Sequence, residues 1–365
     1  MKDKQTRSDF DTLMMQRCLE LAQRAAGKTS PNPIVGSVVV KDGKIIGEGF
    51  HPGVGQPHAE VFALQNAGEE ARGATVYVNL EPCNHYGKTP PCSEALIKAR
   101  VAKVVTGMVD PDPRVAGGGI DKLRKAGIEV VVGIEERACR QLNEAFIHRI
   151  NKKQPFGILK YAMTLDGKIA ATGGHSAWVT GKSSRHLVHQ LRSTCDAVII
   201  GGNTVRKDNP NLTTHNVTEH NPIRVVMSRS LDLLSECNLW NTEVAQTLVF
   251  TENNSNISLQ KKLSDRGVEM ITVTQLTPKI VMEHLYKKEL SKVLWECGGT
   301  LAAKAIADGT IQKVMAFIAP KIIGGTSASS PVGELGLSEM TDALQLKDVE
   351  IKAIDSDILI EGYLS

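Results

Sequence analysis

Four side chains in two short segments restrict what this chain can fold into. His58 and Glu60 stand two residues apart, and Cys83 and Cys92 follow in a proline-rich segment. An imidazole and two thiolates are donors that zinc prefers, and three protein ligands leave one tetrahedral position open, as in catalytic rather than structural zinc sites. The spacing therefore predicts a fold that brings residues 58 and 83–92 together around one zinc ion per chain.

Glu60 is the predicted catalytic residue of this site. A carboxylate beside zinc but not bound to it can take a proton from the zinc-bound water and pass it to a departing amine. Zinc lowers the pKa of that water from 15.7 to about 7. This combination is typical of zinc-dependent nucleobase deaminases, although their cysteines are usually separated by two residues and here by eight. We expect the longer loop to recognise something beyond the base.

A structural zinc site is the alternative interpretation of the same residues. Structural sites normally recruit four protein ligands, and His51 or His85 would have to be the fourth. The local sequence favours the catalytic interpretation, because the motif lies in a strand, turn and helix context. β-Branched and aromatic residues at 74–78 predict a strand, and helices are predicted over 58–68 and from Ser93.

The rest of the first half is predicted to alternate helices and strands around a mixed sheet. An apolar stripe between Phe10 and Ala25 indicates a helix. Asp42-Gly43 predicts a hairpin between Val35–Val40 and Ile45–Phe50. The remaining predicted elements are strands at 101–109 and 128–132, a helix at 120–125, and one long helix from 135 to about 150.

The length of the chain predicts two domains. At 365 residues it exceeds what one hydrophobic core usually holds. A polar stretch that ends at Pro155 places the boundary between domains 1–151 and 152–365. The second domain is again predicted to be α/β, with strands at 156–163, 197–200, 223–227, 247–251, 269–273, 292–296 and 314–318.

Three predicted strand ends in the second domain carry glycines and polar residues. They lie at 160–170, 201–210 and 296–305, and we expect them to form one shared crevice. In the last of them, Gly298 and Gly299 precede a helix, where free backbone N–H groups and the helix dipole suit a phosphate. An ordinary turn explains that one segment equally well.

Composition argues against a nucleic-acid enzyme. Lys and Arg number 43 against 40 acidic residues, and aromatic residues make up 4%, so neither a basic groove nor a stacking surface is indicated. The sequence contains no run of about 18 apolar residues, so neither export nor a membrane span is indicated. We therefore expect a cytoplasmic protein without a membrane partner. Seven cysteines fit a reducing compartment. Five of them are expected to be buried bystanders: Cys18, Cys139, Cys195, Cys237 and Cys297.

Over nearly its whole length the sequence resembles the bifunctional deaminase-reductases of riboflavin biosynthesis. The segments that carry the resemblance are PNPIVG, HAE, PCNHYGKTPPC, KYAMTLDGKIA, GHSAWVTG, GGNTVRKDNPNLT and ECGGTLA, in that order. The resemblance implies an α/β protein with an N-terminal cytidine-deaminase-like three-layer domain and a C-terminal dihydrofolate-reductase-like domain that uses NADPH. It also implies a small phosphorylated pyrimidine as substrate, two consecutive reactions and a homo-oligomer.

The resemblance further implies roles for individual residues. The zinc ligands fall on His58, Cys83 and Cys92, and the proton-transfer residue on Glu60. Implied deaminase substrate contacts are Asn32, His51, Asn84, His85 and Lys88. Implied cofactor contacts are Ala162, Trp178, Thr204, Asp208, Gly298, Gly299, Thr300, Leu301, Ala302, Ala303 and Lys304. Implied reductase substrate contacts are Ser176, Arg192, Leu212 and Glu296.

One departure from the family affects the expected phosphate site. Some relatives have an arginine after the position of Leu212, where this chain has Thr213-Thr214-His215. We therefore expect phosphate affinity to depend more on Arg192, since a guanidinium forms bidentate bonds to such anions. The rival hypothesis is a single-function zinc deaminase, acting on a nucleobase or nucleic acid, with a non-catalytic second domain.

Two further roles stay open at this level. Arg229 either contacts the 2′-phosphate of NADPH or lies in an ordinary loop. Lys160 and Asp208 are the charged candidates for the proton donor of the reduction.

Overall fold

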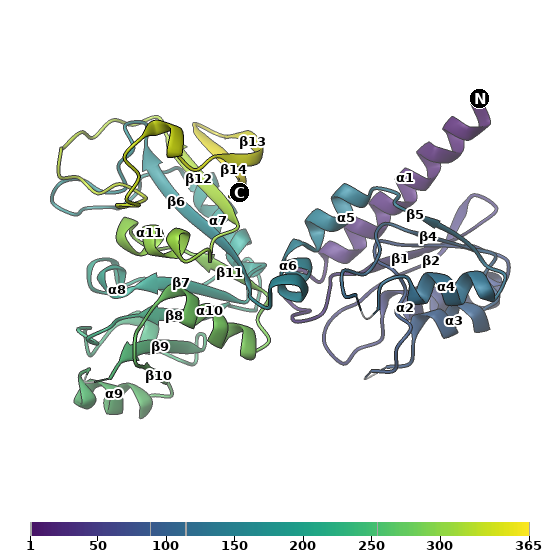
Figure 1. Cartoon of the computed structure of the whole chain (residues 1–365), viewed down its shortest axis with the longest axis horizontal. Coiled ribbons are helices and arrows are strands. Elements are labelled where there is room, and N and C mark those ends of the chain that lie inside the picture. Colours follow the sequence, from purple (N-terminus) through teal and green to yellow (C-terminus); the bar gives the residue numbers. More distant parts are fainter. Residues whose placement is uncertain (1, 88, 114, 254, 365) are drawn as a thin grey trace. The chain divides into compact units, whose positions relative to one another are not determined.

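The chain forms two compact units, Met1–Lys153 and Gln154–Ser365, each with its own β-sheet (Figure 1). The computed structural model describes residues 2–87, 89–113, 115–253 and 255–364, with side chains from Asp9 onward. Within this part of the chain no helix has the length and apolar character that crossing a bilayer requires.

The sheet of the first unit has five strands in the order β2-β1-β3-β4-β5. β1 is antiparallel to β2 and β3, whereas β3, β4 and β5 run parallel. The strands are β1 (Gly36–Lys41), β2 (Lys44–Phe50), β3 (Thr75–Val78), β4 (Lys103–Thr106) and β5 (Glu129–Val132). Asp42 and Gly43 both have positive φ between β1 and β2, which confirms the predicted hairpin.

Helices of the first unit fall into two groups that contact the sheet. α1 contacts β1, β3 and α5, while α2 contacts β1, β2 and α3, which in turn contacts α4. Buried residues of α1, among them Met15 and Cys18, join the valines of β1 and β3 in one core. The helices are α1 (Lys2–Gln23), α2 (Ala59–Ala67), η1 (Gly68–Ala71), α3 (Cys92–Lys98), α4 (Gly118–Lys125), α5 (Glu136–Leu142) and α6 (Glu144–Lys152).

The prediction of one long helix from residue 135 to about 150 was wrong. Asn143 separates α5 from α6, with φ −101° and ψ 20°. Its buried side-chain amide accepts a hydrogen bond from the N–H of Ile34 at 2.8 Å and donates one to the carbonyl of Ile34 at 3.0 Å. This contact, between residues 109 positions apart, satisfies the backbone just before β1.

Replacing Asn143 with alanine is expected to lower the free energy of unfolding of the first unit by about 2 kcal/mol, because it leaves the N–H of Ile34 without its acceptor. The carbonyl of Ile34 keeps a second donor, the side chain of Asn79. Urea unfolding followed by circular dichroism measures the change. An Asn66→Ala variant, which loses one exposed hydrogen bond to Glu48, is the control and should change little; equal losses in the two variants would contradict the prediction.

The sheet of the second unit has nine strands in the order β10-β9-β8-β7-β11-β6-β12-β14-β13. The strands from β10 to β12 run parallel, and β14 and β13 extend the sheet in antiparallel pairs. The strands are β6 (Phe156–Thr164), β7 (Ala197–Gly201), β8 (Ile223–Met227), β9 (Thr247–Glu252), β10 (Glu269–Val273), β11 (Lys292–Trp295), β12 (Lys313–Ala319), β13 (Leu346–Ile354) and β14 (Asp357–Leu364).

The order of the parallel strands positions the second site. β7, β11 and β6 are neighbours, so the segments after them leave the sheet at one edge. The helices are α7 (Lys182–Ser193), α8 (Gly202–Asp208), η2 (Asn238–Trp240), α9 (Ile257–Ser264), α10 (Pro278–Lys287), α11 (Gly299–Ala307) and η3 (Met340–Asp342). Four of the five expected bystander cysteines are buried, and Cys237 is only partly buried.

Candidate functional site

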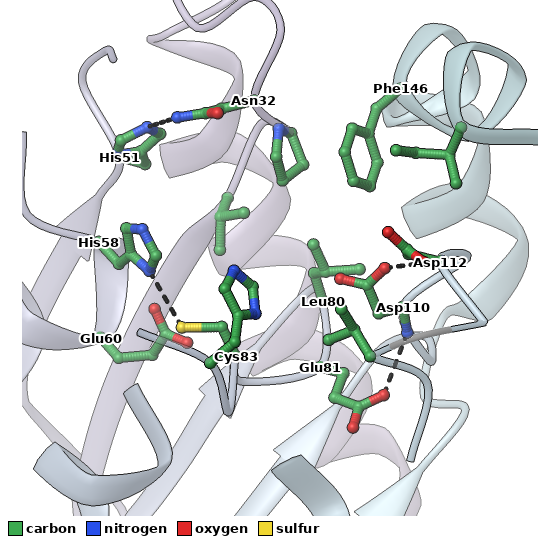
Figure 2. Close-up of a pocket in the computed structure, with 15 residues that line it drawn as sticks. Asn32, His51, His58, Glu60, Leu80, Glu81, Cys83, Asp110, Asp112 and Phe146 are labelled. Atoms are coloured by element: carbon green, nitrogen blue, oxygen red, sulfur yellow. Dashed lines mark hydrogen bonds between the residues drawn. The ribbon is translucent and has the colours of Figure 1, made fainter. Parts of the chain in front are cut away.

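The three predicted zinc ligands converge in the first unit. His58 is the residue before α2, Cys83 lies in the loop after β3, and Cys92 begins α3. Their donor atoms all lie within 4.8 Å of one another. The His58 Nδ1 atom is 3.1 Å from the Cys92 sulfur and 3.4 Å from the Cys83 sulfur. Figure 2 marks the second of these contacts, between His58 and Cys83.

This donor set fits a tetrahedral zinc ion. Zn–S bonds of about 2.3 Å and Zn–N bonds of about 2.0 Å place tetrahedral N and S ligands roughly 3.6 Å apart, close to the separations found. Nδ1 faces the sulfurs, which leaves Nε2 for the hydroxyl of Thr89, 3.3 Å away. A hydrogen bond at the second ring nitrogen orients an imidazole for metal binding. The bond from Cys92 is the main reason why the pKa of the Cys83 thiol is lowered, which favours a thiolate.

Glu60 lies in the first turn of α2, beside the three ligands (Figure 2). Its side chain is almost fully buried, and this burial, helped by the charge of Cys83, raises the pKa of the carboxyl to about 7. A group with that pKa holds and releases a proton near neutral pH.

A cavity of about 240 Å³ opens beside Glu60. Three of the implied substrate contacts, Asn32, His51 and His85, line it together with His58 and Cys83. The remaining lining residues are Pro33, Val35, Leu80, Glu81, Asp110, Asp112, Val115, Phe146 and Ile150.

Two other implied contacts are placed differently. Asn84 does not line this cavity; its side chain donates to the carbonyl of Gly118 and accepts from the hydroxyl of Ser93. Lys88 lies outside the described residues.

His51 and Asn32 form one wall of the cavity with defined hydrogen-bond roles. Nδ1 of His51 lies 3.1 Å from the carbonyl of Pro57, which only accepts, so Nδ1 carries the hydrogen. Nε2 then accepts from the side-chain amide of Asn32 at 3.1 Å. Burial lowers the pKa of His51, and the imidazole is therefore neutral in this arrangement.

Sequence reasoning missed the acidic residues opposite Glu60 (Figure 2). Asp110 and Asp112 line the cavity, and the repeated Asp-Pro pair after β4 was the available signal. Glu81 is buried, and its carboxylate accepts four backbone N–H groups, from Asp110, Gly117, Gly119 and Ile120, at 3.0–3.3 Å. This one side chain ties the loop after β4 to the start of α4.

The second unit contains a cavity of about 430 Å³ at the carboxyl ends of β7, β8 and β11. All three glycine-rich strand ends contribute to it, which confirms the predicted shared crevice. Gly298 has open space where a Cβ would lie, whereas a Cβ on Gly299 would lie 2.6 Å from the carbonyl of Ser330. The implied contacts that line the cavity are Ser176, Thr204, Asp208, Gly298, Gly299, Thr300, Leu301 and Lys304.

Several other implied contacts do not line this cavity. Ala302 and Ala303 are buried in α11. Trp178 is 68% exposed, with the guanidinium of Arg185 4.2 Å from the centre of its ring. The remaining residues outside the lining are Ala162, Arg192, Leu212 and Glu296.

The same cavity is lined by cations to which the sequence assigned no role, or an undecided one. Arg206, Lys207 and Arg229 line it in addition to Lys304, and Arg206 pairs with Asp232. These cations and the open backbone at Gly298 suit a ligand with several phosphate groups.

Glu296 lies at the centre of a buried ion cluster after β11. Its carboxylate accepts from Nε and Nη2 of Arg192 at 2.5 and 3.0 Å, and Nζ of Lys160 lies 3.5 Å away. Burial favours the neutral acid, but the two cations outweigh it and lower the pKa of Glu296 to about 2. Two implied substrate contacts, Arg192 and Glu296, are thus bonded to each other in this structure.

Comparison with known proteins assigns both units. Residues 8–108 match the model of the cytidine and deoxycytidylate deaminase zinc-binding region, and residues 155–360 match the RibD C-terminal domain. The riboflavin biosynthesis protein RibD of Synechocystis is 62% identical over 354 residues, which cover 97% of this chain and 96% of that protein. The chain belongs to the RibD family. The RibD of Aquifex aeolicus is 41% identical and covers 96% of this chain and 98% of that protein.

Solved RibD structures share the whole fold. The RibD of Acinetobacter baumannii superposes with a TM-score of 0.87 at 39% identity, covering 98% of this chain and 99% of that one. A diaminohydroxyphosphoribosylaminopyrimidine deaminase/5-amino-6-(5-phosphoribosylamino)uracil reductase from Thermotoga maritima gives 0.87 at 37% identity, covering 98% and 100%. The chain also spans 60% of the length of the maize protein PYRR, to which it is 45% identical.

RibD membership confirms the predicted fold class and the predicted pair of activities. The protein is a bifunctional enzyme of riboflavin biosynthesis, with a zinc-binding deaminase domain and a reductase domain. The rival hypothesis of a single-function deaminase with a non-catalytic second domain is not supported.

Proposed function

We propose that residues 1–151 deaminate a diamino-pyrimidinone carrying a phosphoribosylamino group, and that residues 152–365 reduce the ribosyl chain of the product to ribityl with NADPH. The name of the Thermotoga relative gives these two substrates. The observation that carries the proposal is the convergence of the donor atoms of His58, Cys83 and Cys92, beside a cavity that His58, Cys83 and the buried Glu60 line.

The deaminase step follows from the residues of this cavity. A zinc ion held by His58, Cys83 and Cys92 would supply Lewis acidity and a water molecule of lowered pKa. Glu60 takes a proton from the attacking water and delivers it to the ring amine, which leaves as ammonia while a ring carbonyl forms. Asn32 and His51 face the same cavity and hold the pyrimidine by hydrogen bonds.

The reductase step uses the second cavity. NADPH would supply the hydride: the C1′–O4′ bond of the ribosylamino group breaks to give a C1′=N imine and a free 4′-hydroxyl, and reduction then adds hydride to C1′ and a proton to the nitrogen, which keeps the C1′–N bond. The start of α11 at Gly298 and Gly299 would hold cofactor phosphate through backbone N–H groups. Arg229 and Lys304 add positive charge to the walls.

Removing zinc with a chelator tests which of the two domains catalyses which reaction. We expect about one zinc ion per chain by atomic spectroscopy, and loss of ammonia release after dialysis against a chelator, because the open zinc position is where water is activated. NADPH oxidation with the deaminated substrate should persist, and mass spectrometry should identify each product. Ammonia release that survives complete zinc removal would contradict the proposal.

Replacing Arg229 with alanine is expected to raise the KM for NADPH about tenfold and to leave the KM for NADH almost unchanged. The reason is that Arg229 lies on the cavity wall at the end of β8, where a 2′-phosphate could be paired with a guanidinium. Steady-state kinetics with both cofactors measures the ratio. Arg266→Ala, which removes a partly exposed cation that does not line the cavity, is the control. A parallel rise of both KM values would contradict a 2′-phosphate contact.

A further inference from the structure

A buried carboxylate of the last hairpin caps helix α7. Asp357, the first residue of β14, is 3% exposed. Its Oδ2 atom accepts the backbone N–H of Gly181 at 2.7 Å and the hydroxyl of Ser184 at 2.6 Å. Gly181 is the residue before α7 and has no side chain of its own to bond the first N–H groups of the helix. A residue 176 positions further along the chain therefore supplies the cap.

The same hairpin makes a second contact with this end of α7. The hydroxyl of Ser183 donates to the carboxylate of Asp355, which lies in the turn between β13 and β14. Two carboxylates thus lie at the positive end of the helix dipole. Hydrogen bonds to a carboxylate are also stronger than those between neutral groups. The turn therefore holds the start of α7 both by hydrogen bonds and by charge.

The segment just before α7 reaches the reductase cavity. Ser176 lines this cavity, and its hydroxyl donates to Asp208, another lining residue, at 3.2 Å. Four residues separate Ser176 from Gly181. Because so short a stretch of backbone connects them, movement of Gly181 changes where Ser176 lies.

Trp178, between these two residues, has a backbone conformation that needs support. Its φ is +61°, in the left-handed region that a bulky residue rarely adopts. Such residues persist only where surrounding contacts hold them. The carbonyl of Trp178 accepts from Nζ of Lys321 at 2.7 Å, and its ring lies against Arg185, which also donates to the carbonyl of Thr180. If the neighbouring cap is removed, we expect the backbone to relax away from this conformation.

We propose that Asp357 is a positioning residue of the reductase: by capping α7 it holds the segment of Ser176 and Trp178 in the arrangement that binds NADPH and the reductase substrate. This inference rests on the proposed reductase function, since it concerns the binding of those two ligands. It gives a role in ligand binding to the hairpin of β13 and β14, although no residue of that hairpin lines the cavity.

Kinetics of the full-length chain test this role. Asp357→Ala should raise the KM for NADPH and for the deaminated substrate about tenfold, the effect of a binding arrangement that only about one molecule in ten still holds. kcat should stay within about twofold of the parent value, because saturating ligands select that arrangement. Asp357→Asn keeps an oxygen that can accept from both donors, so it should restore most of the affinity.

Two further variants separate positioning from a general loss of stability. Glu361→Ala removes another buried carboxylate of β14, one that pairs with Lys352 and Lys313 on the neighbouring strands rather than with α7. It should leave both KM values unchanged. Ser184→Ala removes one of the two donors to Asp357 and should raise both KM values less than Asp357→Ala does. In the double variant it should cause no further rise, because the two side chains share one bond.

Hydrogen exchange followed by mass spectrometry locates the effect in the chain. In Asp357→Ala, the backbone N–H groups of residues 176–184 should exchange faster than in the parent, while those of the core strands β7 and β11 keep the parent rate. Glu361→Ala should leave the exchange of residues 176–184 unchanged.

Three results would overturn the inference. They are KM values of Asp357→Ala that equal those of the parent, a fall of kcat with both KM values unchanged, and the same rise of KM in Asp357→Ala and Glu361→Ala. Failure of the proposed reductase function is distinguishable, because then the parent itself does not oxidise NADPH with the deaminated substrate. Exchange at residues 176–184 would still report whether Asp357 holds the segment.

Discussion

Replacing Glu60 with glutamine is expected to lower deaminase turnover by about 10²–10⁴-fold, the usual contribution of a positioned general acid and base. Glutamine keeps the size of the buried side chain but cannot exchange a proton. Burial raises the pKa of the Glu60 carboxyl, and its position beside the three zinc ligands (Figure 2) puts it within reach of a zinc-bound water. Ammonia release under saturating substrate measures the loss, with zinc content determined on the same sample.

The controls for this variant lie in the same chain. Zinc content should stay near one ion per chain, since Glu60 is not one of the three converging donors. NADPH oxidation with the deaminated substrate should also be unchanged, because the second cavity belongs to the other unit. Glu69→Gln, in the short helix after α2, should keep full turnover. Turnover above half of the parent value in Glu60→Gln would rule out the assigned proton transfer.

Replacing Glu296 with alanine is expected to destabilise the second unit by about 3–5 kcal/mol and to abolish the reductase activity. The substitution leaves the side chains of Arg192 and Lys160, which are 11% and 17% exposed, without their carboxylate. Removing one partner of a buried ion pair costs this much because the remaining charge stays desolvated. Urea unfolding of the full chain at pH 7, followed by tryptophan fluorescence, measures the change; Trp295 lies in the core of that unit.

The pH dependence of this stabilisation has a defined sign. Burial opposes ionisation of Glu296, but Arg192 and Lys160 lower its pKa to about 2, below the value of about 4.3 for an unfolded glutamate. The contribution is therefore complete above about pH 4.3 and is lost as pH falls toward 2. The difference in the free energy of unfolding between the parent and Glu296→Ala should therefore decrease as pH falls over that range.

Glu236 provides the matched control for this variant. It also pairs with two cations, Arg266 and Lys262, but on the surface, where its side chain is 69% exposed. Exposed pairs contribute little because solvent screens them, so Glu236→Ala should unfold close to the parent. Equal unfolding midpoints for the two alanine variants would show that the Glu296 cluster does not stabilise the unit.

Local chemistry explains why much of the first site was predictable. His58, Cys83 and Cys92 are identified by residue type and spacing alone, because few other donors suit zinc with one position open. The hairpin at Asp42-Gly43 was equally accessible, since only a few residue pairs adopt two positive φ values in succession. The hairpin depends on neighbours in sequence, and the zinc ligands are recognised from residue types within two short motifs.

The features that were missed depend on partners far away in sequence. The break at Asn143 requires Ile34, and nothing around residue 143 indicates that contact. β13 is mostly solvent-exposed, so its charged residues obscure the alternating pattern of a strand, and the Asp355-Ser356 turn that joins it to the more buried β14 is a weak signal. The burial of Ala302 and Ala303, within a segment expected to touch the cofactor, depends on how α11 packs on the sheet.

The four backbone N–H groups that donate to Glu81 link one wall of the deaminase cavity to the zinc ligand Cys83. Glu81 precedes Cys83 by two residues, so the same short stretch of backbone holds a metal donor and anchors the wall that carries Asp110. A glutamine there has one oxygen acceptor, and its NH₂ group would face N–H donors that now meet a carboxylate oxygen. A substitution that shifts the loop of Asp110 is therefore expected to shift Cys83 as well, because Glu81 connects the two.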